Sequence, residues 1–174
     1  MSDSEIVPEV FTTDYAGEPG QREFFLQVRG GFGTLTYRVE KTQVQVLAEK
    51  LREVLLLVDA EDTITGTTAQ RDPGMGLEVP LEPDGRVGSI ALAYEEESDN
   101  VVVLLEQPAP DEDEQPVVTA AGAVGFRLRR DQVRAFILHA LAVVEEGRAI
   151  CPICKLPMNP AGHVCPGGNG HHVA

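Results

Sequence analysis

The chain has few basic residues and no long apolar run, and both shortages narrow the classes of partner it can have. It holds 14 Lys and Arg residues against 28 Asp and Glu residues, which gives a formal net charge of −14. Repulsion between like charges disfavours nucleic-acid backbones and anionic membrane surfaces. The longest apolar runs, 54–58 and 101–105, are far shorter than the roughly 20 residues that span a bilayer. We therefore expect no nucleic acid and no membrane among its partners.

Cysteine is also scarce, and its distribution bears on the compartment. All three cysteines lie after residue 150. The N-terminus, Met-Ser-Asp-Ser-Glu, has neither the basic nor the apolar region of a secretory signal peptide. Clustered cysteines without such a signal are typical of reduced thiols or metal ligands rather than of a disulfide framework. We therefore expect a cytoplasmic protein.

Motifs for catalysis are missing as well. The sequence shows no nucleotide-binding loop and no Ser–His–Asp or Cys–His arrangement with a recognisable local motif. His139 lies between the apolar positions Phe136 and Ala140 of a predicted helix, so we interpret it as a helix residue rather than a catalytic base. The acidic stretches 95–99 and 111–114 lack the spacing of a magnesium site and are interpreted as solvated loops.

The chain does contain regular alternation of apolar and polar residues, which predicts β-strands. Strands are predicted over residues 11–15, 23–29, 34–39, 86–94, 101–105 and 123–130. Short loops between consecutive strands favour antiparallel pairing. The run 101–105 is apolar on both faces, and we therefore expect it at the centre of the sheet.

Two helices complete the predicted fold. Thr42 and Gln45 match a capping box, and apolar residues at helical spacing follow as far as Val58. Asp131 is the predicted N-cap of the second helix and Gly147 its C-cap. The order is βββα-βββα. The predicted fold class is α+β, with an antiparallel sheet of about six strands, two packed helices and a small C-terminal zinc knuckle.

The composition divides the chain into two parts. Residues 1–148 are predicted to form the α+β domain, which contains long loops at 59–85 and 107–122. A loop of that length in a compact domain is usually functional or disordered. Residues 149–174 are rich in Pro, Gly, Cys and His and are predicted to be a zinc-binding tail.

The tail carries the strongest chemical signal in the sequence. A C-x2-C pair fits a turn that directs two sulfurs to one point, and a His-x-Cys pair in an extended segment projects both side chains to one side. The other candidates for the fourth ligand are His171 and His172. We predict a zinc ion bound by Cys151, Cys154, His163 and Cys165. Because four protein ligands leave no position for water, the ion would be structural.

Two other interpretations of the tail compete with zinc. One is a disordered segment with incidental thiols. The other is a redox C-x-x-C motif, which normally opens a helix at the end of a strand. Here Pro157 and Pro160 follow a predicted helix instead, and this order disfavours the redox interpretation.

Several residues outside the tail are candidates for binding an anion. The turn 17–22 contains two glycines and can present backbone amides, although it lacks the spacing of a P-loop or a dinucleotide-binding turn. The second predicted helix and the strand before it hold the densest basic cluster, which exposed carboxylates can also neutralise. The candidate ligand-binding residues are Gly20, Arg22, Arg86, Arg127 and Arg129.

Short stretches along most of the chain carry a resemblance to a known family. They are 17–27 (GEPGQREFFLQ), 40–44 (EKTQV), 86–92 (RVGSIAL), 134–136 (RAF), 151–154 (CPIC), 162–166 (GHVCP) and 169–170 (NG). Through them the chain resembles the DUF3090 family, uncharacterised actinobacterial proteins with a Cys/His tail. The resemblance implies an intracellular actinobacterial protein and assigns no activity. In that family an aromatic residue follows Asn-Gly, where this chain has His171 and His172, so the resemblance supports His163 as the ligand.

Two functions from different classes remain open on the sequence. The first is a non-enzymatic binding or adaptor module that has a structural zinc site and a protein partner. The second is a small enzyme or an anionic-ligand-binding domain whose pocket lies between the sheet and the loop 59–85. A flat apolar surface patch would favour the first, and a deep pocket where the arginines converge would favour the second.

Overall fold

The computed structural model describes residues 5–18, 20–61, 64, 67–108, 122–146, 151–156, 158 and 163–168. In chain order the strands and helices, with η for 3₁₀ helices, are β1 (Glu5–Ile6), β2 (Val10–Ala16), β3 (Glu23–Gly30), β4 (Gly33–Val39), α1 (Lys41–Val58), η2 (Pro73–Met75), β5 (Gly85–Arg86), β6 (Ser89–Glu95), β7 (Asn100–Glu106), β8 (Val124–Arg129), α2 (Arg130–Glu146) and η3 (Pro166–Gly168). The described residues therefore form an α+β fold with two α-helices, as the sequence predicts.

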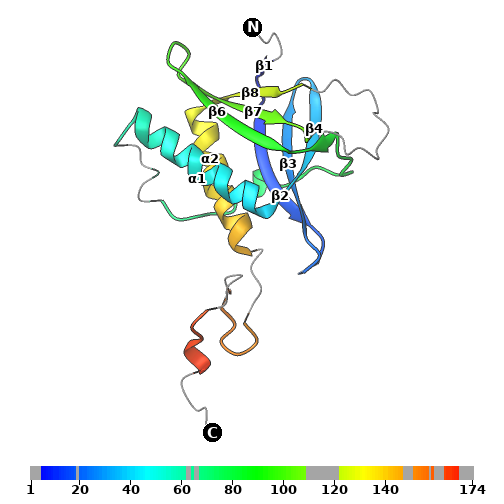
Figure 1. Cartoon of the computed structure of the whole chain (residues 1–174), viewed down its shortest axis with the longest axis vertical. Helices are drawn as coiled ribbons and strands as arrows, with labels where there is room; N and C mark the ends of the chain where they lie inside the picture. The colour runs from blue at the N-terminus through cyan, green and yellow to red at the C-terminus, as the bar shows by residue number, and fades with distance from the viewer. Residues whose placement is uncertain are drawn as a thin grey trace.

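The strands form two four-stranded sheets, in the orders β1-β8-β7-β6 and β2-β3-β4-β5 (Figure 1). Both sheets are mixed, because β1 pairs with β8 and β4 with β5 in parallel while the other pairs are antiparallel. The prediction of one antiparallel sheet of about six strands is therefore wrong. The strands that it missed, β1 and β5, span two residues each, which is too short for alternation to reveal them. The apolar run at β7 does lie inside its sheet, as expected.

The chain crosses from one sheet to the other between β5 and β6. The single strand predicted over 86–94 is in fact two strands, because β5 pairs with β4 and β6 pairs with β7. At the crossing, Gly88 N–H donates to the carbonyl oxygen of Glu106 at 2.7 Å, and a Cβ on Gly88 would lie 2.6 Å from the backbone nitrogen of Pro108. Glycine is needed for this close backbone approach, and an alternation pattern does not show it.

The N-cap of helix α1 lies two residues before the predicted one. Glu40 is the N-cap, and Gln43 Oε1 accepts a hydrogen bond from Glu40 N–H at 2.9 Å. The capping box is thus Glu40 with Gln43, and the predicted pair of Thr42 with Gln45 is wrong because Thr42 already lies inside the helix. The buried stripe of α1 consists of Val44, Leu47, Ala48, Leu51 and Leu55.

Helix α2 also starts before its predicted N-cap. It begins at Arg130, so Asp131 lies in its first turn rather than at the cap. Gln132 Oε1 instead accepts a hydrogen bond from Arg129 N–H at 3.0 Å. The predicted C-cap, Gly147, lies outside the described residues.

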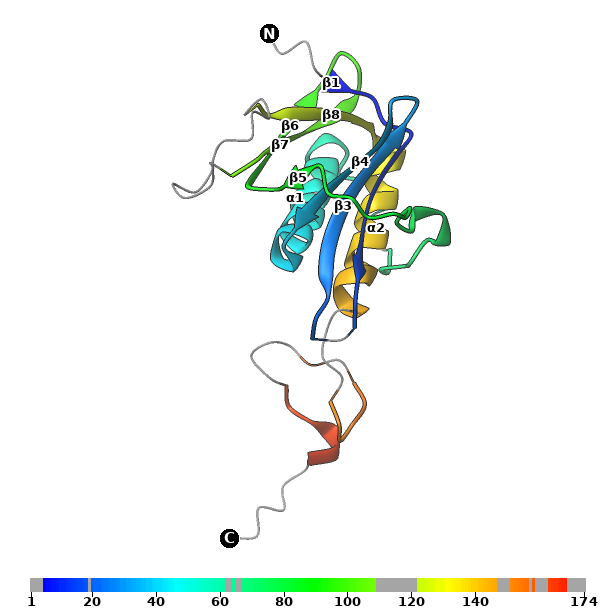
Figure 2. The ribbon, with the colours of Figure 1, turned by 90° about the vertical axis from the view of Figure 1, so that its right-hand side faces the viewer.

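The centre of the core lies where both sheets meet α2. The ring of Phe11 in β2 has its centroid 6.0 Å from that of Phe126 in β8 and 5.0 Å from that of Phe136 in α2. Tyr37 of β4 reaches the same cluster, 6.3 Å from Phe126. Helix α2 packs against both α1 and β2 (Figure 2). Full burial of such side chains stabilises the fold by about 1.5–3 kcal/mol each, so this cluster joins the two sheets into one body.

The loop 59–85 is hydrogen-bonded to the sheet at Met75 and Glu78. Glu78 N–H donates to Gln27 Oε1 at 2.8 Å, and Gln27 Nε2 donates back to Glu78 O at 3.1 Å. Thr12 Oγ1 donates to Met75 O at 2.5 Å. These bonds satisfy the polar groups of two buried side chains of the sheet, so the loop covers that face of β2 and β3. Most of the other predicted loop, 107–122, lies outside the described residues.

The described part of the tail is drawn apart from the two sheets, beyond the end of α2 (Figures 1 and 2). It contains the 3₁₀ helix η3. The division into a domain of 1–148 and a tail of 149–174 agrees with this picture but stays a prediction. Among the described residues, no helix combines the length and the apolar character needed to cross a membrane.

Candidate functional site

A tight turn in the tail sets the two thiols of the C-x2-C motif beside each other. Lys155 N–H donates to Cys151 O at 2.9 Å, and Cys151 N–H donates to Leu156 O at 2.9 Å. Lys155 has a φ of 60°, which is the left-handed region that residues with a Cβ rarely adopt. The returning chain brings the sulfurs of Cys151 and Cys154 into one cluster.

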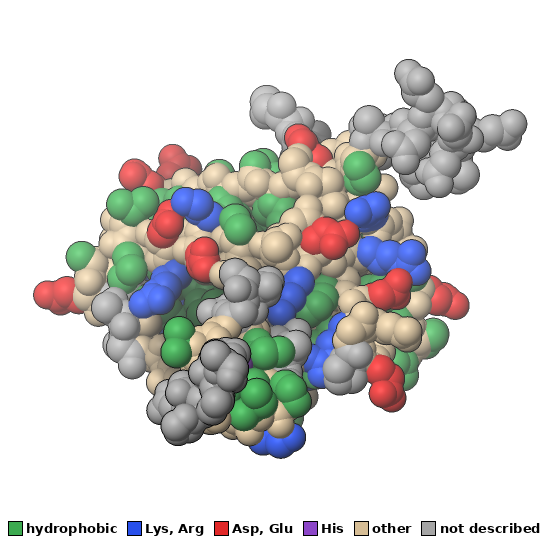
Figure 3. Space-filling view, turned by 60° about the horizontal axis from the view of Figure 1, so that its bottom comes forward, with side chains coloured by type: hydrophobic (Ala, Val, Ile, Leu, Met, Phe, Trp, Pro, Cys, Tyr) green, Lys and Arg blue, Asp and Glu red, His purple; other side chains and the backbone are tan. Residues whose placement is uncertain are grey.

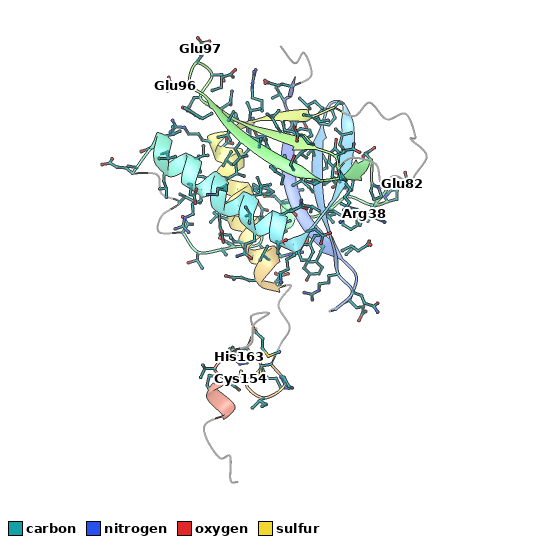
Figure 4. The ribbon with its side chains drawn as sticks, in the orientation of Figure 1. Arg38, Glu82, Glu96, Glu97, Cys154 and His163 are labelled. Carbon is teal, nitrogen blue, oxygen red and sulfur yellow. The ribbon has the colours of Figure 1, made fainter. Side chains whose placement is uncertain are left out.

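Four side chains converge in that cluster, namely Cys151, Cys154, His163 and Cys165, with one ligand atom of each within 4.8 Å of all the others. The Sγ atoms of Cys151 and Cys165 are 3.8 Å apart, and Cys154 Sγ lies 3.2 Å from His163 Nε2 (Figure 4). Zn–S bonds of about 2.3 Å and Zn–N bonds of about 2.05 Å at tetrahedral angles require about 3.8 Å between sulfurs and about 3.6 Å between sulfur and nitrogen. The Cys151–Cys165 separation matches that of a tetrahedral zinc site, the Cys154–His163 separation is somewhat shorter, and the bound of 4.8 Å on all pairs leaves the four atoms close enough to share one ion.

The three cysteines are free thiols. The 3.8 Å between Cys151 Sγ and Cys165 Sγ is far longer than a disulfide bond of about 2.05 Å. This arrangement keeps all three sulfurs available as metal ligands, because the thiolate rather than the disulfide binds metal.

The backbone around the turn favours negative charge on one sulfur. The amide of Cys154 has the largest effect on Cys151 and lowers the pKa of its thiol. Burial opposes this effect and the amide of Ile153 adds to it, so the pKa of Cys151 falls from 9.0 to about 7. The amide of Leu156 favours the thiolate of Cys154 as well. Burial and the neighbouring thiols of Cys151 and Cys165 outweigh it, so the pKa of Cys154 is raised. One sulfur is thus prepared for binding, and crowding disfavours a second thiolate until a cation compensates it.

The cluster is partly enclosed by its own turn. Cys151 is buried. A Cβ on Gly167 would lie 2.9 Å from a methyl carbon of Ile153 and 3.8 Å from Cys165 Sγ. His163 directs Nε2 at the cluster and keeps Nδ1 buried. The donor set and this packing fit a zinc ion, because a histidine that binds metal through Nε2 leaves Nδ1 to be oriented by its surroundings.

The four clustered residues are those predicted as metal ligands from the sequence. The alternatives for the fourth position, His171 and His172, lie outside the described residues, as do Pro157 and Pro160.

Three of the five predicted ligand-binding residues share a second feature, a cavity of about 540 Å³ at the ends of β3, β4 and β5 and the start of α1. Its lining consists of Gly20, Arg22, Glu23, Phe24, Arg38, Val39, Glu40, Lys41 and Arg86. Sequence reasoning did not find Arg38 and Lys41. The only linear signal was that Arg38 occupies the outward position between two apolar residues of its strand.

The other two predicted ligand-binding residues lie elsewhere and bind carboxylates of the chain. Arg127 contacts Glu5 at 2.5 Å and Glu95 at 3.2 Å. Arg129 contacts Asp131 at 3.0 Å. These ion pairs account for the two arginines as part of a solvated strand face.

His139 of α2 is fully buried, at 0% exposure. Its Nδ1 accepts a hydrogen bond from Asp72 N–H at 3.0 Å. Burial lowers the pKa of His139; Asp14 opposes this effect and Arg71 adds to it. A neutral imidazole that anchors the loop 59–85 agrees with its interpretation as a helix residue rather than a catalytic base.

The fold and the site together define a class: an α+β protein of two mixed sheets with a Cys₃His cluster near its C-terminus that could hold a metal ion. The family model described as "Protein of unknown function (DUF3090)" matches residues 6–165 of the chain. The chain belongs to this family. No curated protein and no solved structure matches it, so the functional conclusion rests on the geometry of the sites.

Proposed function

We propose that this protein is a non-enzymatic binding module that carries a structural zinc ion. The supporting observation is the closed set of four donors, Cys151, Cys154, His163 and Cys165, within 4.8 Å of one another. Thiolate and imidazole are the ligands that zinc prefers, and four of them complete a tetrahedron. No position then remains for the water that zinc hydrolases activate.

The zinc ion would order the tail. The described tail residues hold little secondary structure beyond the three residues of η3, so apolar burial alone supplies little folding free energy there. In such segments the free energy of metal binding is also the free energy of folding.

The binding role of the domain is supported by an apolar groove of about 610 Å³ between α1 and β6. Val46 and Leu57 of α1 line it and are 53% and 86% exposed. Its charged side chains, Lys50 and Glu53, pair with each other at 2.8 Å. The groove therefore favours an uncharged, apolar occupant.

The occupant that we propose is an extended apolar segment of a partner protein. Among the described strands β6 is the last of its sheet, so one edge of it has no strand neighbour. An added strand would use the backbone groups of that edge, and its alternate side chains would enter the groove beside it.

Metal analysis of the purified protein tests the zinc proposal. We expect about one equivalent of zinc in the wild type, loss of zinc in His163→Ala and full zinc in the matched variant His171→Ala. Less than half an equivalent in the wild type would contradict the proposal. The opposite behaviour of the two variants would reassign the fourth ligand.

Site-specific photo-crosslinking in cells tests the groove. A photoreactive residue at Leu57 should capture one defined protein, and Val46→Asp should abolish the capture because it places a charge in the groove. The same reagent at Phe32, an exposed residue of the turn between β3 and β4, is the matched control. Equal capture at both positions, or capture that survives Val46→Asp, would contradict the proposal.

An anionic-ligand-binding domain is the second candidate function. One observation supports it: Gly20, Arg22 and Arg86 line one cavity together with Arg38 and Lys41. This function does not depend on the zinc ion.

A further inference from the structure

We propose that the basic pocket, the cavity lined by Arg22, Arg38, Lys41 and Arg86, binds the phosphate group of a small phosphate monoester. The inference rests on the second candidate function and names its ligand class. The pocket holds four cationic side chains in a chain whose net charge is −14.

The strongest support is a pair of like charges held together by the sheet. Arg38 of β4 and Arg86 of β5 are direct partners in the parallel register. Neighbouring strands lie about 4.8 Å apart, so residues in register project side by side from the same face. Like charges in that position repel each other and destabilise the sheet. An anion bound between the two guanidinium groups would attract both of them and offset their repulsion.

Among the described residues, a carboxylate neutralises the charge of Arg86 but not that of Arg38. Arg86 contacts Glu40 at 3.0 Å, and both side chains are exposed. Arg38 is exposed and makes no ion pair with any residue that the structure describes. Basic and acidic side chains are interspersed on the face in Figure 3. Figure 4 shows Arg38 on the opposite side of the molecule from Glu96 and Glu97.

Arg22 is held in place on the other wall of the pocket. Its guanidinium lies 4.2 Å from the centroid of the Tyr15 ring and donates to the carbonyl oxygen of Glu146. Its Nε is buried without a hydrogen-bond partner among the described residues. A guanidinium fixed by stacking loses little entropy when it binds an anion.

The start of α1 adds to the positive potential. Its first residue is Lys41, and its first turn holds no acidic residue. A cation there opposes the helix dipole, whereas an anion at a helix N-terminus is stabilised by it. An anion bound in the pocket would therefore be favoured by the helix terminus as well as by the basic side chains.

The shape and charge of the pocket define the ligand. Guanidinium forks match phosphate oxygens in two-point contacts, and a dianion suits several converging cations. Phe24 and Val39 give the cavity an apolar wall, and its volume of about 540 Å³ leaves room for an organic group. Glu23 and Glu40 also line it and would repel a polyphosphate or nucleic acid, so the ligand is a small monoester.

Amide chemical shifts of the zinc-loaded full chain, titrated with inorganic phosphate at constant ionic strength, test the proposal. We expect saturable shifts at the four basic residues. Arg38→Gln should weaken binding about tenfold, the loss of one charge-assisted hydrogen bond. Arg129→Gln, which removes an exposed arginine outside the pocket, should bind like the wild type. Shifts that do not saturate, or equal affinity in all three proteins, would overturn the proposal.

The melting temperatures of the same samples, with and without phosphate, distinguish an Arg38 that binds the ligand from an Arg38 that only supports the fold. Without phosphate, Arg38→Gln should unfold at a higher temperature than the wild type, because it removes the repulsion from Arg86. With phosphate, the wild type should gain more stability than the variant, because it binds the ligand more tightly. A lower melting temperature of the variant without phosphate would contradict the proposal. Zinc content measured on the same samples separates failure of the pocket from failure of the metal site.

Discussion

Lys155 is where the backbone of the zinc turn is under strain. It takes a φ of 60° directly after Cys154, and its amide closes the turn onto Cys151 O at 2.9 Å. That conformation costs a residue with a Cβ about 1–2 kcal/mol of conformational free energy, and it does not cost glycine this amount. This strain lies in the segment that folds when the metal binds, so it weakens metal binding.

Lys155→Gly should therefore tighten zinc binding about fivefold, which corresponds to about 1 kcal/mol. Competition with a chromophoric chelator measures the change. Lys155→Ala is the matched control, because alanine removes the same charge but keeps the Cβ. Equal gains in both variants would assign the effect to the lost lysine side chain and contradict the account.

His139 makes stability depend on pH. Burial lowers its pKa below the usual value; Arg71 adds to this, and Asp14 and Asp72 oppose it. The unfolded chain therefore binds more protons than the native chain in mild acid. The resulting loss of stability begins as the pH falls below about 6.5 and is at most about 1.4 kcal/mol per pH unit.

His139→Gln should flatten this dependence. Urea unfolding at pH 7.5 and pH 5.5 gives the loss of unfolding free energy on acidification for each protein. We expect a smaller loss in the variant, whatever its stability at pH 7.5. An equal loss in both proteins would mean that His139 is not the group that titrates.

At the scale of elements, the crossing between β5 and β6 depends on Gly88. A Cβ there would lie 2.6 Å from the backbone nitrogen of Pro108, and backbone cannot rotate away as a side chain can. Gly88→Ala should cost about 1–3 kcal/mol of unfolding free energy in urea. Gly31→Ala is the control, because nothing lies within 4 Å of its Cβ position. Similar costs for both would contradict the role of Gly88 in the crossing.

The longer elements could be predicted because each carries a repeated signal. The strands β2, β3 and β4 alternate over seven or eight residues, and α1 repeats at helical spacing over 18 residues. The two-residue strands β1 and β5 carry no such signal. Their parallel pairing, which makes each sheet mixed, depends on tertiary packing, so the single predicted sheet was wrong.

The two sites differ in predictability for a similar reason. The ligands of the cluster lie within 15 residues of chain, from Cys151 to Cys165, and their type and spacing identify them. The basic pocket takes Arg38 from β4, Lys41 from α1 and Arg86 from β5. Arg38 and Lys41 are neighbours in the sequence, but the parallel pairing of β4 with β5 is what places Arg86 beside Arg38, and the linear sequence does not contain that pairing.

At the scale of the whole molecule, the domain should keep its fold without the metal, because its hydrophobic core is built from residues 11–144. Removing zinc with a chelator under reducing conditions should leave the far-ultraviolet circular dichroism and the main thermal transition unchanged. Hydrogen exchange should rise in peptides from the tail alone. Loss of the main transition on chelation would show that the metal supports the domain as well.

The central claim is that zinc is held by three sulfurs and one imidazole nitrogen with no water. X-ray absorption at the zinc edge of the purified protein tests it most directly. We expect three sulfur neighbours at about 2.3 Å and one nitrogen at about 2.0–2.1 Å with the scattering pattern of an imidazole ring. Two sulfurs with two or more light neighbours, one of them exchangeable water, would show an open site and contradict it.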